Sequence, residues 1–166
     1  MILLRRFLVV MALLFWQGGF LFYSSVVVPV GQSVLASPKD QGFITQRVTD
    51  YMNLAGAVAL LVLLVELFLT PANKPWISWT RRASWLVMFL ALLGIAGLHI
   101  RLDGLLDLED MEIMDRKAFH ASHRWYLWLC TIQWFFGVVY LWLTLWSWRT
   151  VDQMGNKVEK KYLGEK

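Results

Sequence analysis

The side chains best suited to chemistry in this 166-residue sequence are its three histidines and one nearby aspartate. His99 and Asp103 are four residues apart, so on a helix they share a face and the carboxylate can orient the imidazole. His120 and His123 lie at the start of a later apolar run. Imidazole with carboxylate suits Zn, Cu, Ni or Fe, and paired histidines on facing helices can hold a haem. These four residues are candidate metal ligands; the simpler interpretation is that they form hydrogen bonds at helix ends.

The sequence lacks the motifs that would mark an enzyme or a stronger metal centre. It has no His-Glu-x-x-His motif and no glycine-rich phosphate loop, and its acidic stretch 103–115 lacks the ligand order of an EF-hand. The single cysteine, Cys130, offers neither an internal disulfide nor a thiol metal motif. We assign no catalytic residue and expect a non-enzymatic protein. The cofactor stays open between none, a metal ion and a haem.

Three further polar side chains are expected inside the membrane, namely Glu66, Tyr23 and Gln133. Glu66 is the only acid within an apolar run, and an ionisable group there is a functional candidate by default. It would suit a small transporter that binds its substrate inside a helical bundle. The simpler interpretation places Glu66 near the membrane edge, where it reaches lipid headgroups, Lys74 or Arg82, or pairs with a neighbouring helix.

Composition indicates which elements must position these groups. The chain is 58% hydrophobic and 17% charged, whereas soluble domains have about 45–50% apolar and about 25% charged residues. The excess falls in four runs, each long enough to cross a hydrocarbon core of about 30 Å as a helix. They cover about residues 7–30, 51–70, 83–100 and 125–148. We predict an all-α membrane protein: residues 1–149 form an antiparallel bundle of four transmembrane helices, and residues 150–166 form a polar tail that is either a short, frayed, soluble helix or disordered.

The segments between the runs carry their own signals. Pro29 is expected to end the first helix and Pro71 the second, and residues 72–82 are expected to form a short basic loop. Between residues 102 and 115, leucines and methionines are interleaved with acids, which predicts a short amphipathic helix before the fourth span. A signal peptide cleaved near Val34-Leu35-Ala36 is the alternative for the first run. We disfavour it because that run is closer to a transmembrane length than to a leader.

The fourth run is predicted to have two different faces. Small and polar residues recur with a period of about 3.5, which defines a seam expected to face the other helices because unpaired polar groups are costly in lipid. The seam consists of Tyr126, Cys130, Gln133, Gly137, Tyr140 and Thr144. Nearly opposite lies an aromatic stripe, expected to face lipid or a membrane protein partner. The stripe consists of Trp128, Phe135, Trp142 and Trp146. Trp146 and Trp148 are expected at a membrane interface.

The distribution of basic residues predicts an orientation. The N-terminus, residues 72–82 and the tail together hold ten of the sixteen Lys and Arg residues, and the other two connections hold six. The positive-inside rule then places both termini in the cytoplasm, and the membrane is expected to be a bacterial inner membrane. Because the basic residues lie at helix ends and in the tail, the net charge of +4 is explained by topology, and we expect no nucleic-acid partner.

Three stretches carry a resemblance to known proteins. Gly19 to Tyr23, Val28-Pro29, and Phe119 to Tyr126 with His123 resemble a family of small four-span membrane proteins of unknown function, which includes a mammalian transmembrane protein associated with drug resistance. The chain is more distantly similar to the copper-resistance D group. The resemblance implies a four-helix bundle and a tie to metal or stress handling, and it carries over no catalytic residue. The acidic stretch and the tryptophan-rich fourth span depart from the family's pattern.

These observations favour one function and leave two alternatives. The favoured hypothesis is a non-enzymatic subunit or accessory of a membrane assembly, with the aromatic stripe as its contact surface. The first alternative is a metal- or haem-binding membrane protein with its histidines at the outer mouth of the bundle. The second alternative is a small transporter that uses Glu66.

Overall fold

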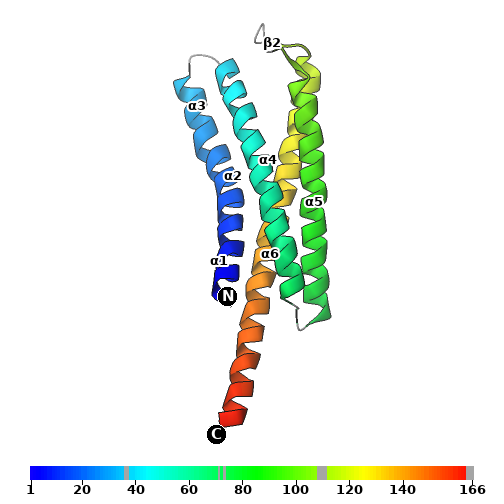
Figure 1. Ribbon diagram of the computed structural model, residues 1–166. Helices are drawn as coiled ribbons and strands as arrows, with labels where there is room; N and C mark the ends of the chain where they lie inside the picture. Colours follow the sequence, from blue (N-terminus) through cyan, green and yellow to red (C-terminus); the bar gives the residue numbers. More distant parts are fainter. Residues whose placement is uncertain (36–37, 71, 73, 108–111, 164–166) are drawn as a thin grey trace.

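The computed structural model describes residues 1–35, 38–70, 72, 74–107 and 112–163. Within them the chain forms four long helices that run side by side in alternating directions (Figure 1). The first helix, Ile2–Val34, contains α1 (Ile2–Leu13), α2 (Gly19–Phe22) and α3 (Val28–Val34), joined by π-helical turns. The other three are α4 (Pro38–Leu69), α5 (Pro75–Asp103) and α6 (Arg116–Leu163). All four are long and apolar enough to cross a membrane, which confirms the predicted all-α class with four spans.

The two ends of the bundle differ in what they carry. Both termini and the connection between α4 and α5 lie at one end, here called the terminal end (Figure 1). The connection between α3 and α4 lies at the opposite end together with a small β-hairpin, and this is called the hairpin end. Which end faces the cytoplasm stays a prediction from the charge distribution.

Pro29 does not end the first helix, contrary to the prediction. The helix passes through this proline and ends at Val34. A π-helical turn, Tyr23–Val27, directly precedes α3. Proline lacks an N–H and presses on the carbonyl four residues earlier, and a π turn relieves that conflict by widening the helix locally. The hydroxyls of Ser24 and Ser25 both donate to the Leu21 carbonyl, which further satisfies the altered backbone.

The third span begins earlier than predicted. Residues 75–82 were expected in a loop, but α5 starts at Pro75, where a proline at the first helical turn sacrifices no hydrogen bond. Arg81 therefore lies within a helix and not in a basic loop, and its side chain is buried. Pro71, expected to end the second span, lies outside the described residues, whereas Leu69 is the last residue of α4.

The prediction of an amphipathic helix between residues 102 and 115 is wrong. After α5 ends at Asp103, two short strands, β1 (Leu106–Asp107) and β2 (Glu112–Ile113), pair antiparallel. Residues 108–111 lie outside the described part. Alternating apolar and acidic residues fit a strand period as well as a helix face, so the pattern alone did not decide between them.

The fourth helix extends well beyond its apolar part. It begins at Arg116, before the predicted span, and continues through the polar tail to Leu163. Residues 164–166 of the predicted tail lie outside the described residues. Along the apolar part, the seam is buried from Cys130 to Thr144, and the aromatic stripe is exposed, with Trp128 63% and Trp142 65% accessible. Both faces were predicted correctly.

The core lies between the helices and is concentrated toward the terminal end. The first helix contributes Val9, Leu13 and Trp16, and these pack with α4 and with Tyr140 and Trp148 of α6. The first run is therefore part of the bundle. Trp148 was expected at a membrane interface, but it is buried in this core.

Candidate functional site

A polar pocket of about 440 Å³ lies between the four helices in the half of the bundle near the hairpin end. Its size falls in the range typical of small-molecule sites. One indole and one amide side chain of the first helix, those of Trp16 and Gln17, close the pocket on the side toward the terminal end. Trp16 lies directly on Gly56 of α4, and Gln17 lies against Gly137 of α6. These glycines allow the close approach, because an added Cβ at Gly56 would fall 2.7 Å from the Trp16 ring nitrogen.

The first helix leaves one side of the pocket open. Its first part, α1, packs against both α4 and α6, whereas α3 packs against α4. Beyond Trp16 and Gln17 the first helix therefore follows α4 and diverges from α6 (Figure 1). The pocket lies where the two helices diverge, between Tyr23 of the first helix and Tyr126 of α6.

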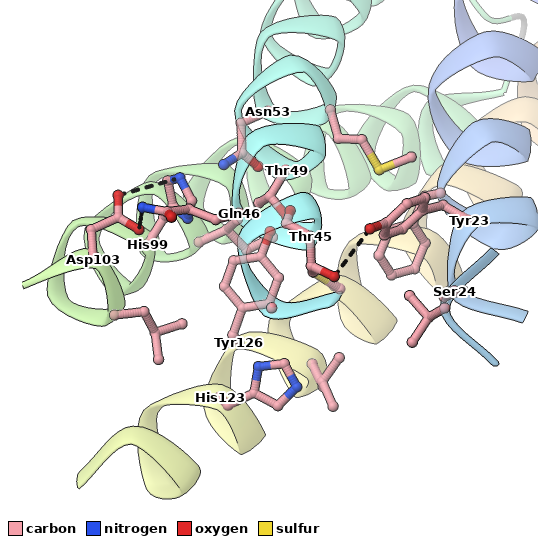
Figure 2. A pocket seen from close by; sticks show the side chains of 18 of the residues that line it. Tyr23, Ser24, Thr45, Gln46, Thr49, Asn53, His99, Asp103, His123 and Tyr126 are labelled. Atoms are coloured by element: carbon pink, nitrogen blue, oxygen red, sulfur yellow. Dashed lines mark hydrogen bonds and ion pairs between the residues drawn. The ribbon is translucent and has the colours of Figure 1, made fainter. Parts of the chain in front are cut away.

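A short series of hydrogen bonds between hydroxyl and amide groups connects the first helix to α4 along one wall of the pocket. The Tyr23 hydroxyl donates to Thr45 Oγ1 at 3.0 Å (Figure 2). The Thr45 hydroxyl in turn donates to the Gln41 carbonyl. The Gln41 amide lies on Gly31 so closely that any side chain at that position would collide with it. Tyr23, predicted as an intramembrane polar residue, therefore faces the pocket and joins two helices.

The opposite wall holds an imidazole between two carboxylates. His99 Nε2 lies 2.7 Å from Asp50 Oδ1 and 3.5 Å from Asp103 Oδ2. Gln46 donates its amide to Asp103 at 2.8 Å, which connects α4 to the end of α5 (Figure 2). The predicted orientation of His99 by Asp103 is present, but Asp50 is the closer partner.

The seam of α6 supplies the deeper polar groups. The Tyr126 hydroxyl lies beside Thr49, Asn53 and Cys130. Gln133, predicted as an intramembrane polar residue, lines the pocket and donates its amide to the Met88 carbonyl at 3.1 Å. Most polar groups of the pocket are thus neutral amides and hydroxyls, set among aromatic and aliphatic side chains. The apolar lining includes Trp16, Phe20, Val28, Met52, Ile95, Phe119 and Leu127.

The candidate metal ligands do not come together at one point. His99, Asp103 and His123 line the pocket, whereas His120 is exposed and packs edge-on against Phe119. His123 stacks on the same ring, with 6.2 Å between centroids. Among the described residues no group of three or more His, Cys, Asp or Glu is placed to hold a metal ion. The metal and haem interpretation therefore gains no support.

A second polar cluster lies at the terminal end around Glu66, whose side chain is 0% exposed. Its carboxylate accepts hydrogen bonds from the Thr70 hydroxyl and from the Trp148 indole at 2.7 Å, and Arg5 Nε lies 3.1 Å from its second oxygen. Arg5 also donates to Thr70 Oγ1. Glu66 was predicted near the membrane edge within reach of Lys74 or Arg82. Of these expectations the helix pairing is confirmed: Glu66 is buried and joins the first helix, α4 and α6, with Arg5 as its basic partner and not Lys74 or Arg82.

The neighbouring arginine ties the N-terminus to the extended part of α6. Arg6 donates two hydrogen bonds to the Asp152 carboxylate, at 2.8 and 2.7 Å, and its guanidinium lies over the Trp148 ring. Both residues lie outside the four apolar runs. The hydrogen bonds from Arg6 hold the pKa of the Asp152 carboxyl below its ordinary value. This pair covers the terminal side of the Glu66 cluster.

Sequence reasoning missed several of these residues. Asp50, Gln46 and Asn53 were not singled out, although each lies on the α4 face that also carries Thr49. Arg5 and Arg81 were interpreted as topology signals and Trp148 as an interface residue. A positional signal existed for Arg81, because it falls on the buried stripe of α5 that includes Ile77, Ser84, Met88, Ala91 and Ile95.

Comparisons with known proteins add no identification. No family model, no curated protein and no solved structure matches the chain. The resemblance to small four-span proteins stays a prediction.

Proposed function

We propose that this protein binds a small, amphipathic, uncharged molecule in the polar pocket and takes it up from the bilayer between the first helix and α6. One observation carries the proposal: a pocket of about 440 Å³ in a transmembrane bundle, lined by both hydrogen-bonding and apolar side chains. Pockets with convergent polar groups on an apolar wall are the usual form of small-molecule sites.

The lining predicts the chemistry of the ligand. Amide and hydroxyl groups of Gln17, Asn53, Tyr126 and Gln133 can pair with a hydroxyl, carbonyl or amide of a bound molecule. The opposite wall carries two carboxylates, Asp50 and Asp103, around the single imidazole of His99, so it offers no excess positive charge to an anion. A neutral polar end is therefore favoured over an anion. The aromatic and aliphatic wall suits an apolar body, and a molecule of this kind partitions into the bilayer.

This proposal is more specific than the role of a membrane-assembly subunit that the sequence favoured. The aromatic stripe is exposed as expected, but lipid covers such a face as well as a protein does. The two roles are compatible, since a ligand-binding protein can belong to an assembly. The lining of the pocket indicates the chemistry of a ligand, whereas the aromatic stripe does not.

The single cysteine is a native reporter for this pocket. Cys130 is buried and lines the pocket, and it is the only cysteine in the chain. A small neutral thiol reagent, methyl methanethiosulfonate, is applied to the protein in lipid nanodiscs, and the modified fraction is followed by mass spectrometry. We expect steady modification of Cys130 in the native protein and much slower modification of Asn53→Phe, whose ring fills the pocket beside Tyr126.

The control variant adds the same ring to the opposite face of α4. Val58 is 53% exposed, so Val58→Phe should leave the rate of Cys130 modification unchanged. If Asn53→Phe reacts as fast as the native protein, the pocket is not an open space and the proposal is wrong.

A further inference from the structure

Arg81 is buried inside the bundle with part of its guanidinium unpaired. It lies on α5 near the terminal end and is 1% exposed. Nη1 donates to the Thr70 carbonyl at 2.8 Å, and the guanidinium carbon lies 5.5 Å from the centre of the Tyr140 ring. Within the described part of the chain, Nε and Nη2 have no hydrogen-bond partner. A buried polar group without a partner is costly, and buried charges in proteins are normally paired.

The nearby carboxylate does not neutralise this charge. Glu66 is the acid of the cluster: its Oε1 accepts from Thr70 and Trp148, and its Oε2 forms an ion pair with Arg5 Nε but accepts no hydrogen bond from the described residues. The ion pairs formed by the described residues include none to Arg81 within 4.0 Å. Arg5 and Arg81 against Glu66 leave the cluster with one excess positive charge. Arginine cannot lose its proton under these conditions, so deprotonation does not relieve the excess.

Two hydroxyls near Arg81 are also buried without partners. Ser84 lies one turn along α5 from Arg81, and Thr144 lies one turn along α6 from Tyr140, next to its hydroxyl. Both side chains are 0% exposed; the Ser84 hydroxyl has no hydrogen-bond partner among the described residues, and the Thr144 hydroxyl only contacts that of Tyr140 without a well-formed hydrogen bond. Arg81 over the Tyr140 ring brings the two helices together at this level. The unpaired groups are therefore two guanidinium nitrogens, which only donate, and two hydroxyls, which can donate.

We propose that a small monovalent inorganic anion, with the chemistry of chloride, binds at Arg81 between α5 and α6, with the hydroxyls of Ser84 and Thr144 as further donors. Such an ion supplies both the missing acceptor and the missing negative charge. Water would satisfy the hydrogen bonds but not the charge. The full burial of all three side chains favours a small ion over a phosphate or a lipid headgroup. This site is separate from the polar pocket and does not depend on its proposed ligand.

The test measures the midpoint of thermal unfolding of the detergent-purified protein in sodium chloride, bromide, phosphate or gluconate at equal ionic strength. We expect the midpoint to rise with chloride and bromide concentration, and not with gluconate, because a bound ion stabilises only the folded state. Arg81→Gln should abolish the difference between chloride and gluconate. Arg82→Gln removes a neighbouring exposed arginine and should retain it. Ser84→Ala should shift the response to higher chloride concentrations.

The direct measurement is the anomalous diffraction of crystals grown in bromide, which should give a peak beside Arg81 of the native protein. This keeps the test decisive if Arg81→Gln does not fold. Equal midpoints in chloride and gluconate together with no bromide peak would overturn the proposal in favour of bound water. A chloride response that survives in Arg81→Gln, or that is lost in Arg82→Gln, would place the ion elsewhere. Stabilisation by phosphate alone would overturn the assignment to a small monovalent ion.

Discussion

Glu66→Leu should lower the free energy of unfolding by about 3 kcal/mol, the lower part of the range for breaking a buried ion pair from one side. The substitution leaves the Trp148 indole and the Thr70 hydroxyl without an acceptor in a buried site. It also leaves Arg5 without its carboxylate, although that side chain is 28% exposed and recovers some hydration. For this reason we expect the lower and not the upper part of the range.

The measurement is reversible unfolding in mixed micelles, with three matched variants. Glu66→Gln keeps a hydrogen-bond acceptor and should lose less stability than Glu66→Leu. The double variant Arg5→Met with Glu66→Leu removes both charges and should regain part of the loss, as a coupled pair does. Val65→Leu, at an exposed neighbouring position, should change little. A loss for Glu66→Leu no larger than that for Val65→Leu would show that the cluster does not hold the helices together.

Gly56→Leu should lower the free energy of unfolding by about 2 kcal/mol, within the range for overpacking a core. A Cβ at this position would lie 2.7 Å from the Trp16 ring nitrogen, and Trp16 is itself only 5% exposed. The indole has little room to move, so α4 and the first helix must separate or Trp16 must enter the pocket. In either case we also expect slower modification of Cys130.

The same unfolding assay checks this prediction, with Gly97→Leu as the matched control. Gly97 has no atom within 4 Å of an added Cβ, so that substitution should be neutral or slightly stabilising because leucine is a better helix former than glycine. Trp16→Leu combined with Gly56→Ala should recover stability relative to Gly56→Leu, since it removes the ring that collides. Equal losses at Gly56 and Gly97 would contradict the close packing of the first helix on α4.

The faces of the fourth helix could be predicted because they depend on sequence period alone. A 3.5-residue repeat of small and polar side chains, from Cys130 to Thr144, is sufficient to say which face is buried. The same rule would have found Arg81, which continues the buried stripe of Ser84 and Met88 at the same spacing. It was missed because charged residues were used to mark the ends of spans, which placed Arg81 in a loop.

Other features depend on contacts between distant residues and could not be predicted. The partners of Glu66 come from α1 and α6. Arg5 precedes Glu66 by 61 residues in the sequence, and Trp148 follows it by 82 residues. The pocket exists because the first helix diverges from α6 beyond Gln17, and this divergence reflects packing and two π-helical turns. Hydropathy patterns contain none of this information.

The most direct test of the central claim is native mass spectrometry of the protein released from lipid nanodiscs. We predict one bound molecule of defined mass per protein chain in the native protein and in Val58→Phe, and its loss in Asn53→Phe, because only the last substitution fills the pocket. The same bound mass in Asn53→Phe, or a native protein that carries nothing beyond a variable number of bulk lipids, would contradict a ligand site between the helices.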